Sequence, residues 1–241
     1  MSYTYGKHRY LFIYGDSKYL ETYRKNQINQ ILMQYFTSKN EDISDEDNLL
    51  PRFNVVDSNQ EICIKGKCTI TLTNGNTLPT AGLNGGLSLS YKDIDTIRKI
   101  TIEDASLMTV ENKTSFLRSN DAYTYVYLGG FATKGQVSFL KKIIQDNPMI
   151  GYYHFGDIDA GGFWIHKKLC QQTGTDFHLF AMSKDELSNK QYHNYLLPLT
   201  DNDVTRLTNL RDDVNYSDCI HYMLKHNVKL EQEIISYSIS K

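Results

Sequence analysis

The carboxyl-terminal part of the chain alternates between apolar runs and amphipathic segments. From about residue 105, short stretches rich in apolar and aromatic residues are separated by segments whose apolar residues recur at helical spacing. This alternation predicts βαβ units, with right-handed crossovers and a parallel sheet that has helices on its faces. The carboxyl ends of the strands then share one edge, where open α/β sheets bind ligands. The predicted strands are SLMTV, YTYVYL, IGYYHF and DFHLF, and the predicted helices are KTSFLRS, KGQVSFLKKIIQD and GGFWIHKKLCQQT.

The chain up to residue 100 mixes both patterns and predicts a smaller α+β region. RYLFIYG (9–15) indicates a strand, and the helical spacing after it predicts a helix over residues 17–36. The acidic stretch at 40–48 has few apolar residues and many like charges, which is typical of a solvated loop.

Two further elements are expected in this region. EICIKGKCTITL (61–72) alternates apolar and polar residues around a Lys-Gly pair, which predicts a hairpin of two short strands. Ser90 and Asp93 form a capping-box pattern that predicts a helix over residues 91–99.

The last part of the chain predicts a helical tail. Its helical segments are DNDVTRLTNLRDDV and YSDCIHYMLKHNVKLEQEIIS. The predicted organisation is therefore an α+β region at 1–100, an α/β Rossmann-like parallel-sheet domain at 101–185, and a helical tail at 186–241 that packs on that domain.

The composition is that of a globular protein. Of the 241 residues, 40% are apolar and 22% are charged. No apolar run approaches the roughly 20 residues that span a bilayer, and the amino-terminal sequence lacks the pattern of a secretory signal. We therefore expect a soluble, cytoplasmic protein without a membrane partner.

The cysteines and the net charge argue against two simple functions. Cys63 and Cys68 flank IKGK, a spacing that makes a poor zinc site, and with Cys170 and Cys219 they are expected to be reduced packing residues. The net charge of −2 lacks the basic excess that is typical of nucleic-acid-binding proteins. A polyanionic partner would therefore have to meet a local basic patch or bound metal ions.

Three carboxylates follow predicted strands. Asp157 and Asp159 come directly after IGYYHF, and Glu111 comes directly after SLMTV, so all three are expected at one rim of the sheet. Side chains at i and i+2 of extended backbone point the same way, so the two aspartates can converge on one ion. Gly156 allows close backbone approach, and a Gly-Gly pair at 161–162 permits a sharp turn. Clustered carboxylates suit a hard cation such as Mg²⁺.

Several ordered motifs carry a resemblance to a known family. The DID of residues 157–159, with Glu111 after an earlier strand, resembles the acidic motif of the Toprim fold. TVENKTSF, YLGGF, HFGDIDAGGFWIHKKL and AMS, in this order, resemble the carboxyl-terminal domain of the JetD family, the nuclease subunits of bacterial Wadjet anti-plasmid systems. FIYGDSKYLE and KLEQE also resemble stretches of that family, so that the likeness covers most of the chain.

The resemblance implies a metal-dependent DNA endonuclease with a Toprim-like fold. Asp157 and Asp159 would bind Mg²⁺, for which Mn²⁺ could substitute, and Glu111 would bind metal or act as general acid/base. The implied partners are DNA, a condensin-like, SMC-type Wadjet complex, and a second copy of the chain in a homodimer. Full-length members are longer, and we expect that this chain lacks, or holds only in part, their additional amino-terminal DNA-binding segments.

Other residues near the motifs have competing interpretations. Lys113 is the strongest candidate for a DNA contact, while Asn112 fits a turn former better than a substrate contact. His154 fits a core histidine or a supporting residue behind the metal ligands. Gly156 is the remaining candidate close to the DID. The other candidates for a local basic surface are Lys134, Lys141, Lys142, His166, Lys167 and Lys168.

The roles of several acidic and basic residues outside the central motifs are also open. Asp16 and Lys18 fit turn and N-cap roles, although they lie in a family-like stretch. Glu231 and Glu233 fit either solvent-exposed positions on a terminal helix or a contribution to the site. Asp159 could also serve only as a helix cap.

Two other functions remain as alternatives. A topoisomerase VI A-like activity would use the same acidic site beside a tyrosine nucleophile, and the chain has 18 tyrosines. A non-catalytic DNA-binding or assembly subunit would keep the fold without turnover. Covalent DNA adducts would identify the first alternative, and a metal titration would test the second.

Overall fold

The chain forms two compact units in a computed structural model that describes residues 4–5, 25–38, 55–56, 61–119 and 122–239. The units are Met1–Gln60 and Glu61–Lys241. In the first unit, β1 (Thr4–Tyr5) pairs in parallel with β2 (Val55–Val56), and α2 spans Lys25–Thr37.

The predictions for the first unit are tested only in part. Helix α2 covers the second half of the helix predicted over residues 17–36. The strand predicted at 9–15, the acidic stretch at 40–48, Asp16 and Lys18 lie outside the described residues.

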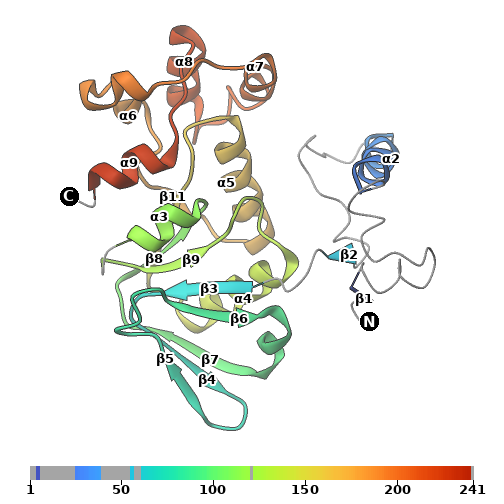
Figure 1. Cartoon of the computed structure of the whole chain (residues 1–241), viewed down its shortest axis with the longest axis vertical. Coiled ribbons are helices and arrows are strands. Elements are labelled where there is room, and N and C mark those ends of the chain that lie inside the picture. Colours follow the sequence, from blue (N-terminus) through green and yellow to red (C-terminus); the bar gives the residue numbers. More distant parts are fainter. Residues whose placement is uncertain (1–3, 6–24, 39–54, 57–60, 120–121, 240–241) are drawn as a thin grey trace. The chain divides into compact units, whose positions relative to one another are not determined.

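A six-stranded, mostly parallel sheet organises the second unit (Figure 1). Its order is β11-β10-β8-β9-β3-β6, in which β8 pairs in parallel with β10 and β9, and β10 pairs in parallel with β11. β3 runs antiparallel to both β9 and β6. The predicted α/β class is therefore confirmed. The strands are β3 (Glu61–Lys65), β6 (Leu87–Ser90), β8 (Ser106–Val110), β9 (Thr124–Tyr127), β10 (Gly151–Phe155) and β11 (His178–Leu179).

The three predicted crossover helices are present, and each begins at a side-chain cap. They are α3 (Lys113–Arg118), α4 (Lys134–Asp146) and α5 (Ala160–Thr173). Asn112 caps α3, Thr133 forms a capping box on α4, and Asp159 caps α5. In each case a side-chain oxygen accepts a backbone N–H of the first turn that has no partner within the helix.

The predicted hairpin at residues 61–72 is wrong, although both of its strands exist. β3 belongs to the central sheet, whereas β4 (Cys68–Leu72) pairs with β5 (Thr77–Pro79) and β7 (Ile97–Ile102) in a second, three-stranded sheet. The alternation of apolar residues predicts a strand but not its partner. β3 is buried from its second residue onward and is hydrogen-bonded on both sides by β9 and β6, so β4 has no edge of β3 to join.

The helix predicted over residues 91–99 is also wrong. Ser90 does cap a helix, but this helix is a 3-10 helix, η3 (Tyr91–Thr96), and β7 follows it immediately. The β-branched residues of IRKITI favour a strand, and three isoleucines of β7 are buried in the core of the unit. The boundary predicted at residue 100 falls inside β7, whereas the two units divide at Gln60–Glu61.

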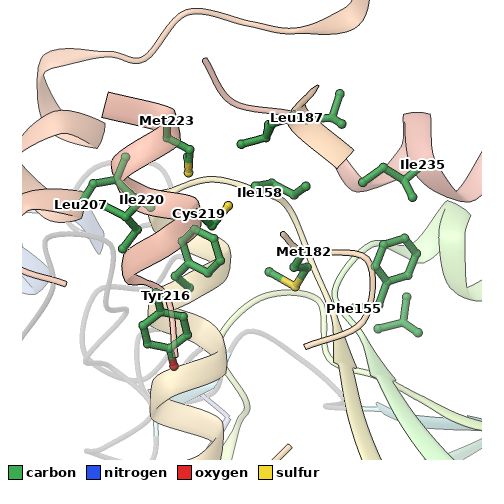
Figure 2. Packing of buried hydrophobic residues seen from close by; sticks show 14 of the residues in the cluster. Phe155, Ile158, Met182, Leu187, Leu207, Tyr216, Cys219, Ile220, Met223 and Ile235 are labelled. Carbon is green, nitrogen blue, oxygen red and sulfur yellow. The ribbon is translucent and has the colours of Figure 1, made fainter. Parts of the chain in front are cut away.

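The central sheet separates two hydrophobic cores. Alternate residues of its strands enter opposite cores, as Leu107 and Met108 do on β8. One core contains α4, part of α5 and the inner face of the three-stranded sheet. The other contains Phe155 from β10 together with residues of the tail helices (Figure 2).

Helices make up most of the chain after β11, and they share a core with the sheet. Helices α6, α7 and α8 gather at one end of the unit (Figure 1), and α9 lies against α3. Ile220 of α8 and Ile235 of α9 are buried in the same core as Ile158, which lies between the two aspartates (Figure 2). The tail consists of α6 (Lys184–Ser188), η4 (Lys190–Tyr195), α7 (Asp201–Thr208), α8 (Ser217–His226) and α9 (Gln232–Ile239).

Two smaller expectations can be compared with the structure. All four cysteines are free thiols, and Cys63, Cys68 and Cys219 are buried, as expected for packing residues. Across the described ranges, no helix has the length and apolar character needed to cross a membrane.

A substitution in the tail should destabilise the whole second unit, because its helices share a core with the sheet. Ile220→Ala removes a fully buried side chain and should lower the free energy of unfolding by about 2–5 kcal/mol. Chemical denaturation followed by far-UV circular dichroism measures this change. Val214→Ala is the control, because Val214 is 88% exposed and its truncation should change stability by less than about 0.5 kcal/mol. A separate early transition confined to the helices would contradict the shared core.

Candidate functional site

Glu111 and Asp157 lie together at the carboxyl ends of two neighbouring parallel strands. In the β8–β10 register Val110 faces Phe155, so that the residues after each strand emerge side by side. The backbone N–H of Glu111 donates to the Phe155 carbonyl at 3.1 Å. The backbone N–H of Asp157 in turn lies 3.4 Å from Glu111 Oε2. The structure thus brings together two of the three predicted carboxylates.

Two glycines make this close arrangement possible. A Cβ atom on Gly156 would lie 2.7 Å from Glu111 Oε2, so a side chain at this position would displace the carboxylate. A Cβ atom on Gly162 would lie 2.1 Å from the Asp157 carbonyl oxygen, which is far inside contact distance. The expectation that Gly156 permits close approach is confirmed.

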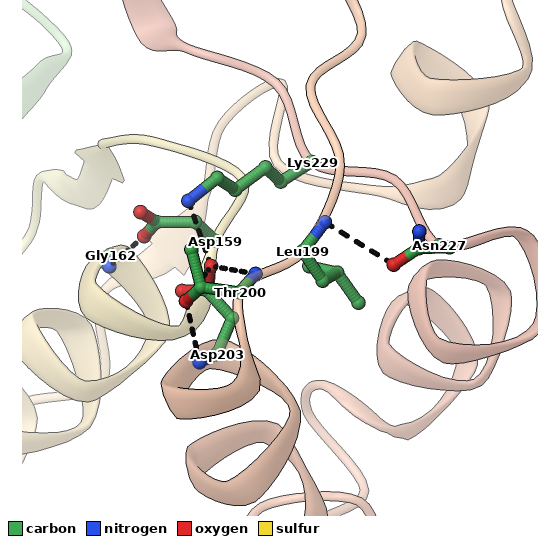
Figure 3. A network of polar contacts seen from close by, with 7 residues as sticks. All are labelled: Asp159, Gly162, Leu199, Thr200, Asp203, Asn227 and Lys229. Atoms are coloured by element: carbon green, nitrogen blue, oxygen red, sulfur yellow. Dashed lines mark hydrogen bonds and ion pairs between the residues drawn. The ribbon is translucent and has the colours of Figure 1, made fainter.

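Asp159 has a different environment from Asp157 (Figure 3). Its Oδ1 accepts the Gly162 N–H at 2.8 Å as the N-cap of α5, so the capping interpretation of this residue is confirmed. Lys229 lies nearby and forms an ion pair with Asp203 at 2.8 Å. The positive charge of Lys229 also acts on the Asp159 carboxylate. Asp159 therefore belongs to a network that contains a cation, and the charge of Lys229 acts on Asp157 as well.

Burial and mutual repulsion favour the neutral forms of the two central carboxylates. Burial, followed by the charges of Asp157 and Asp159, raises the pKa of Glu111 to about 8. Burial also raises the pKa of Asp157 to about 6, although the hydrogen bond from the backbone of Gln232 opposes this shift. Both carboxylates are thus destabilised as anions at neutral pH.

A divalent cation would relieve this repulsion, and the donor set suits Mg²⁺. Mg²⁺ prefers carboxylate oxygens, keeps several waters, and binds proteins through one or two carboxylates plus substrate phosphates. Among the described residues, no cluster of three or more His, Cys, Asp or Glu side chains forms a complete metal site. The Glu111–Asp157 pair fits the smaller protein contribution that Mg²⁺ requires. The role of these residues as metal ligands stays a prediction.

The segment before and within α9 completes the rim of the site. Leu230 forms an antiparallel bridge with Ile158, in which each backbone N–H donates to the other residue's carbonyl. Gln232 is fully buried, and its backbone N–H donates to Asp157 Oδ1 at 2.7 Å. Glu233 accepts a hydrogen bond from the Asn112 side chain. Glu231 is exposed but lies near enough for its charge to act on Asp157.

Sequence reasoning singled out Glu231 and Glu233 but missed Gln232. The only signal was its position within KLEQE, where a neutral amide between two acids indicates no function. Asn112 is the N-cap of α3, accepting the N–H groups of Thr114 and Ser115, which agrees with its predicted role as a turn former.

His154 is a buried residue next to the carboxylates. Its Nδ1 lies 2.9 Å from Thr109 Oγ1, and its Nε2 is buried with no hydrogen-bond partner in the described part of the chain. A Cβ atom on Gly156 would lie 2.9 Å from this Nε2, on the glycine that Glu111 also approaches. Burial lowers the pKa of His154 to about 3, so the ring is neutral.

The candidates for a basic surface differ in their exposure. His166 does not contribute, because it is 3% exposed and its two ring nitrogens face the Tyr216 hydroxyl and the Phe177 carbonyl. Lys113 is exposed, yet its ammonium lies 4.7 Å from the centre of the Tyr127 ring. His166 lies three residues from both Phe163 and Leu169, so helical periodicity places it on the apolar face of α5 and could have predicted its burial.

The remaining lysines have mixed environments. Lys134 is exposed at the first turn of α4, and Lys141 is exposed further along the same helix, where Lys142 is half-buried. Lys167 forms an ion pair with Asp213 at 3.1 Å. The ammonium of Lys168 lies 5.8 Å from the centre of the Phe131 ring.

Comparison with known proteins places this site in a family. The family model described as "Wadjet protein JetD, C-terminal" matches residues 71–241, which include every element of the site. The chain belongs to this family. It is also 27% identical over 231 residues to the Wadjet protein JetD of Bacillus cereus (strain Q1), in an alignment that covers 92% of this chain and 55% of that relative. The chain thus spans about half the length of the curated relative that it matches.

Removing the charge of Glu111 should stabilise the metal-free protein. Its pKa rises from 4.5 to about 8 on folding, so ionisation of Glu111 destabilises the fold progressively as the pH rises between these values. At pH 8 in EDTA, Glu111→Gln should raise Tm by about 2–8 °C, equivalent to about 1–2 kcal/mol, because solvent screening of the half-buried carboxyl reduces the full value of about 4–5 kcal/mol. At pH 4.5 the difference should be much smaller.

Differential scanning fluorimetry at both pH values measures this effect. Asp95→Asn is the control, because Asp95 is exposed and its substitution should change stability by less than about 0.5 kcal/mol at either pH. An equal or lower Tm for Glu111→Gln at pH 8 would show that the carboxylate is not under electrostatic stress.

Proposed function

We propose that this chain carries the catalytic site of a metal-dependent DNA endonuclease that acts in a Wadjet defence system. The observation that supports this most directly is the Glu111–Asp157 pair at the ends of adjacent parallel strands, buried enough to raise both pKa values. Perturbed carboxylates at this edge of an α/β sheet are typical of a functional site. Membership of the JetD carboxyl-terminal family supports the Wadjet context and a Toprim-like identity for the sheet.

The three carboxylates of the site would have different roles. Glu111 and Asp157 would hold Mg²⁺ or Mn²⁺ through their carboxylate oxygens, and Asp159 would contribute charge while it caps α5. A bound ion supplies activation of water and stabilisation of the leaving oxygen in phosphodiester hydrolysis. If Glu111 does not bind the ion, it would instead act as general acid/base near the scissile phosphate, because its carboxyl is half-buried and its pKa in the metal-free protein is about 8.

Binding of DNA would depend on groups beyond this site. The net charge is −2, and the DNA-facing candidates that remain are exposed lysines such as Lys134. Phosphate contacts supply much of the affinity of DNA-binding proteins. We therefore propose that SMC-type, condensin-like partners deliver circular DNA to the site. A homodimer of this chain would provide a second site for cutting the other strand.

Plasmid cleavage tests the proposal. The purified chain, alone and with its SMC-type partners, should convert supercoiled plasmid to nicked or linear DNA in Mg²⁺ or Mn²⁺ but not in EDTA. Glu111→Gln and Asp157→Asn should each lower the rate about 100-fold or more, because loss of metal-assisted stabilisation is worth several kcal/mol. Gel electrophoresis measures the rate, and Asp95→Asn should cleave as the wild type does.

Three outcomes would overturn or change the proposal. Cleavage that both site substitutions leave intact would place the chemistry elsewhere. A protein–DNA adduct that survives denaturation would favour the tyrosine mechanism of a topoisomerase. Absence of cleavage with all partners and metals would favour an assembly subunit.

The two roles of Asp159 can be separated by two substitutions. Asparagine is as good an N-cap as aspartate, so Asp159→Asn should keep the thermal stability of the wild type, whereas Asp159→Ala should lose about 0.5–2 kcal/mol. If the charge of Asp159 supports metal binding, Asp159→Asn should nevertheless require more Mg²⁺ for half-maximal cleavage. An unchanged Mg²⁺ requirement would reduce Asp159 to a cap.

A further inference from the structure

We propose that Gln232 is a positioning residue that sets the separation of Glu111 and Asp157. Its side-chain Oε1 accepts the backbone N–H of Asn112, the residue directly after Glu111, at 2.9 Å. Its Nε2 donates to the carbonyl of Phe155, two residues before Asp157, at 3.1 Å. One amide therefore joins the two segments that carry the carboxylates. The inference rests on one part of the proposed function, namely that these two carboxylates bind the metal ion.

The backbone of Gln232 adds a third contact within the site. Its N–H donates to Asp157 Oδ1 at 2.7 Å, which orients that carboxylate and opposes the rise in its pKa. A carboxylate held through one oxygen keeps the lone pairs of its other oxygen for a cation. Gln232 thus fixes both the distance between the two strand ends and the orientation of one carboxylate.

A neutral amide of this length satisfies these contacts. One end of the side chain must donate to a carbonyl while the other end accepts from an N–H, and glutamine provides both. An ionised glutamate could accept but not donate, and it would add another negative charge to a group of carboxylates that already repel one another. A lysine could donate but not accept. Because Gln232 is 0% exposed, water cannot replace a lost partner without a rearrangement.

The position of Gln232 is itself held on both sides. Before it, the Leu230–Ile158 bridge fixes the chain to the residue between the two aspartates. After it, Ile235 is 1% exposed in the core, and Ser236 Oγ lies 3.0 Å from Ser115 Oγ on α3. These contacts make the amide a rigid spacer.

Mn²⁺ binding by Gln232→Met and by a matched control tests the proposal. Methionine keeps the length of the side chain but removes both polar ends. Asn147→Leu is the control, because the Asn147 amide also joins two backbone groups, donating to the Ile100 carbonyl and accepting from the Ile102 N–H, each at 2.9 Å. Asn147 lies before β10, at the end of the strand opposite to the carboxylates.

Free Mn²⁺ is measured by electron paramagnetic resonance in the absence of DNA, with Tm measured in parallel. Gln232→Met should bind Mn²⁺ about 10-fold or more weakly than the wild type, in the range typical of residues that orient metal ligands. Asn147→Leu should lower Tm but leave the Mn²⁺ affinity within about twofold of the wild type. Gln232→Asn keeps the amide but is one methylene too short to span both segments, so it should show an intermediate loss and serves if Gln232→Met does not fold.

The outcomes separate this inference from the proposed function. Wild-type protein that binds no Mn²⁺ would overturn the metal site and the proposed function with it. Wild-type binding that Gln232→Met and Gln232→Asn leave unchanged would overturn the positioning role alone. Equal weakening by Gln232→Met and Asn147→Leu would also overturn it, because the effect would then follow general stability.

Discussion

Electrostatic repulsion between half-buried carboxylates is the constraint on which this structure depends. Parallel pairing of β8 with β10 brings Glu111 and Asp157 to one edge of the sheet. The glycines at 156 and 162 leave room there for the Glu111 carboxylate and the Asp157 carbonyl. In a low-dielectric setting two such charges repel strongly and are poorly hydrated. The fold therefore holds an arrangement that it would not adopt for stability alone, which is typical of functional sites.

The contacts that hold this arrangement come from parts of the chain that are distant in sequence. The bridge from Leu230 to Ile158 and the amide of Gln232 reach the strand ends from the carboxyl-terminal segment, and Lys229 balances the charges of Asp159 and Asp203. The tail helices share the core on that face of the sheet (Figure 2). The tail is thus part of the architecture of the site rather than a separate cover.

Local sequence patterns predicted what depends on local interactions. The βαβ alternation, the carboxylates after β8 and β10, and the helical tail follow from periodicity and from the geometry of parallel sheets. Strand partners do not follow, because β3 and β4 have equally good strand patterns and yet enter different sheets. The bridging amide of Gln232 does not follow either, because it depends on contacts with segments far away in the chain.

The dependence of the site on residues 229–236 has a consequence for the biosynthesis of the protein. A ribosome adds these residues long after both carboxylates have been made, and a polypeptide that stops short of Leu230 lacks the bridge to Ile158 and the hydrogen bond to Asp157. Nascent and prematurely terminated chains would then carry the acidic residues without the contacts that orient them. Under the proposed DNA-cleaving function, this order of assembly would keep incomplete molecules harmless to the cell that makes them.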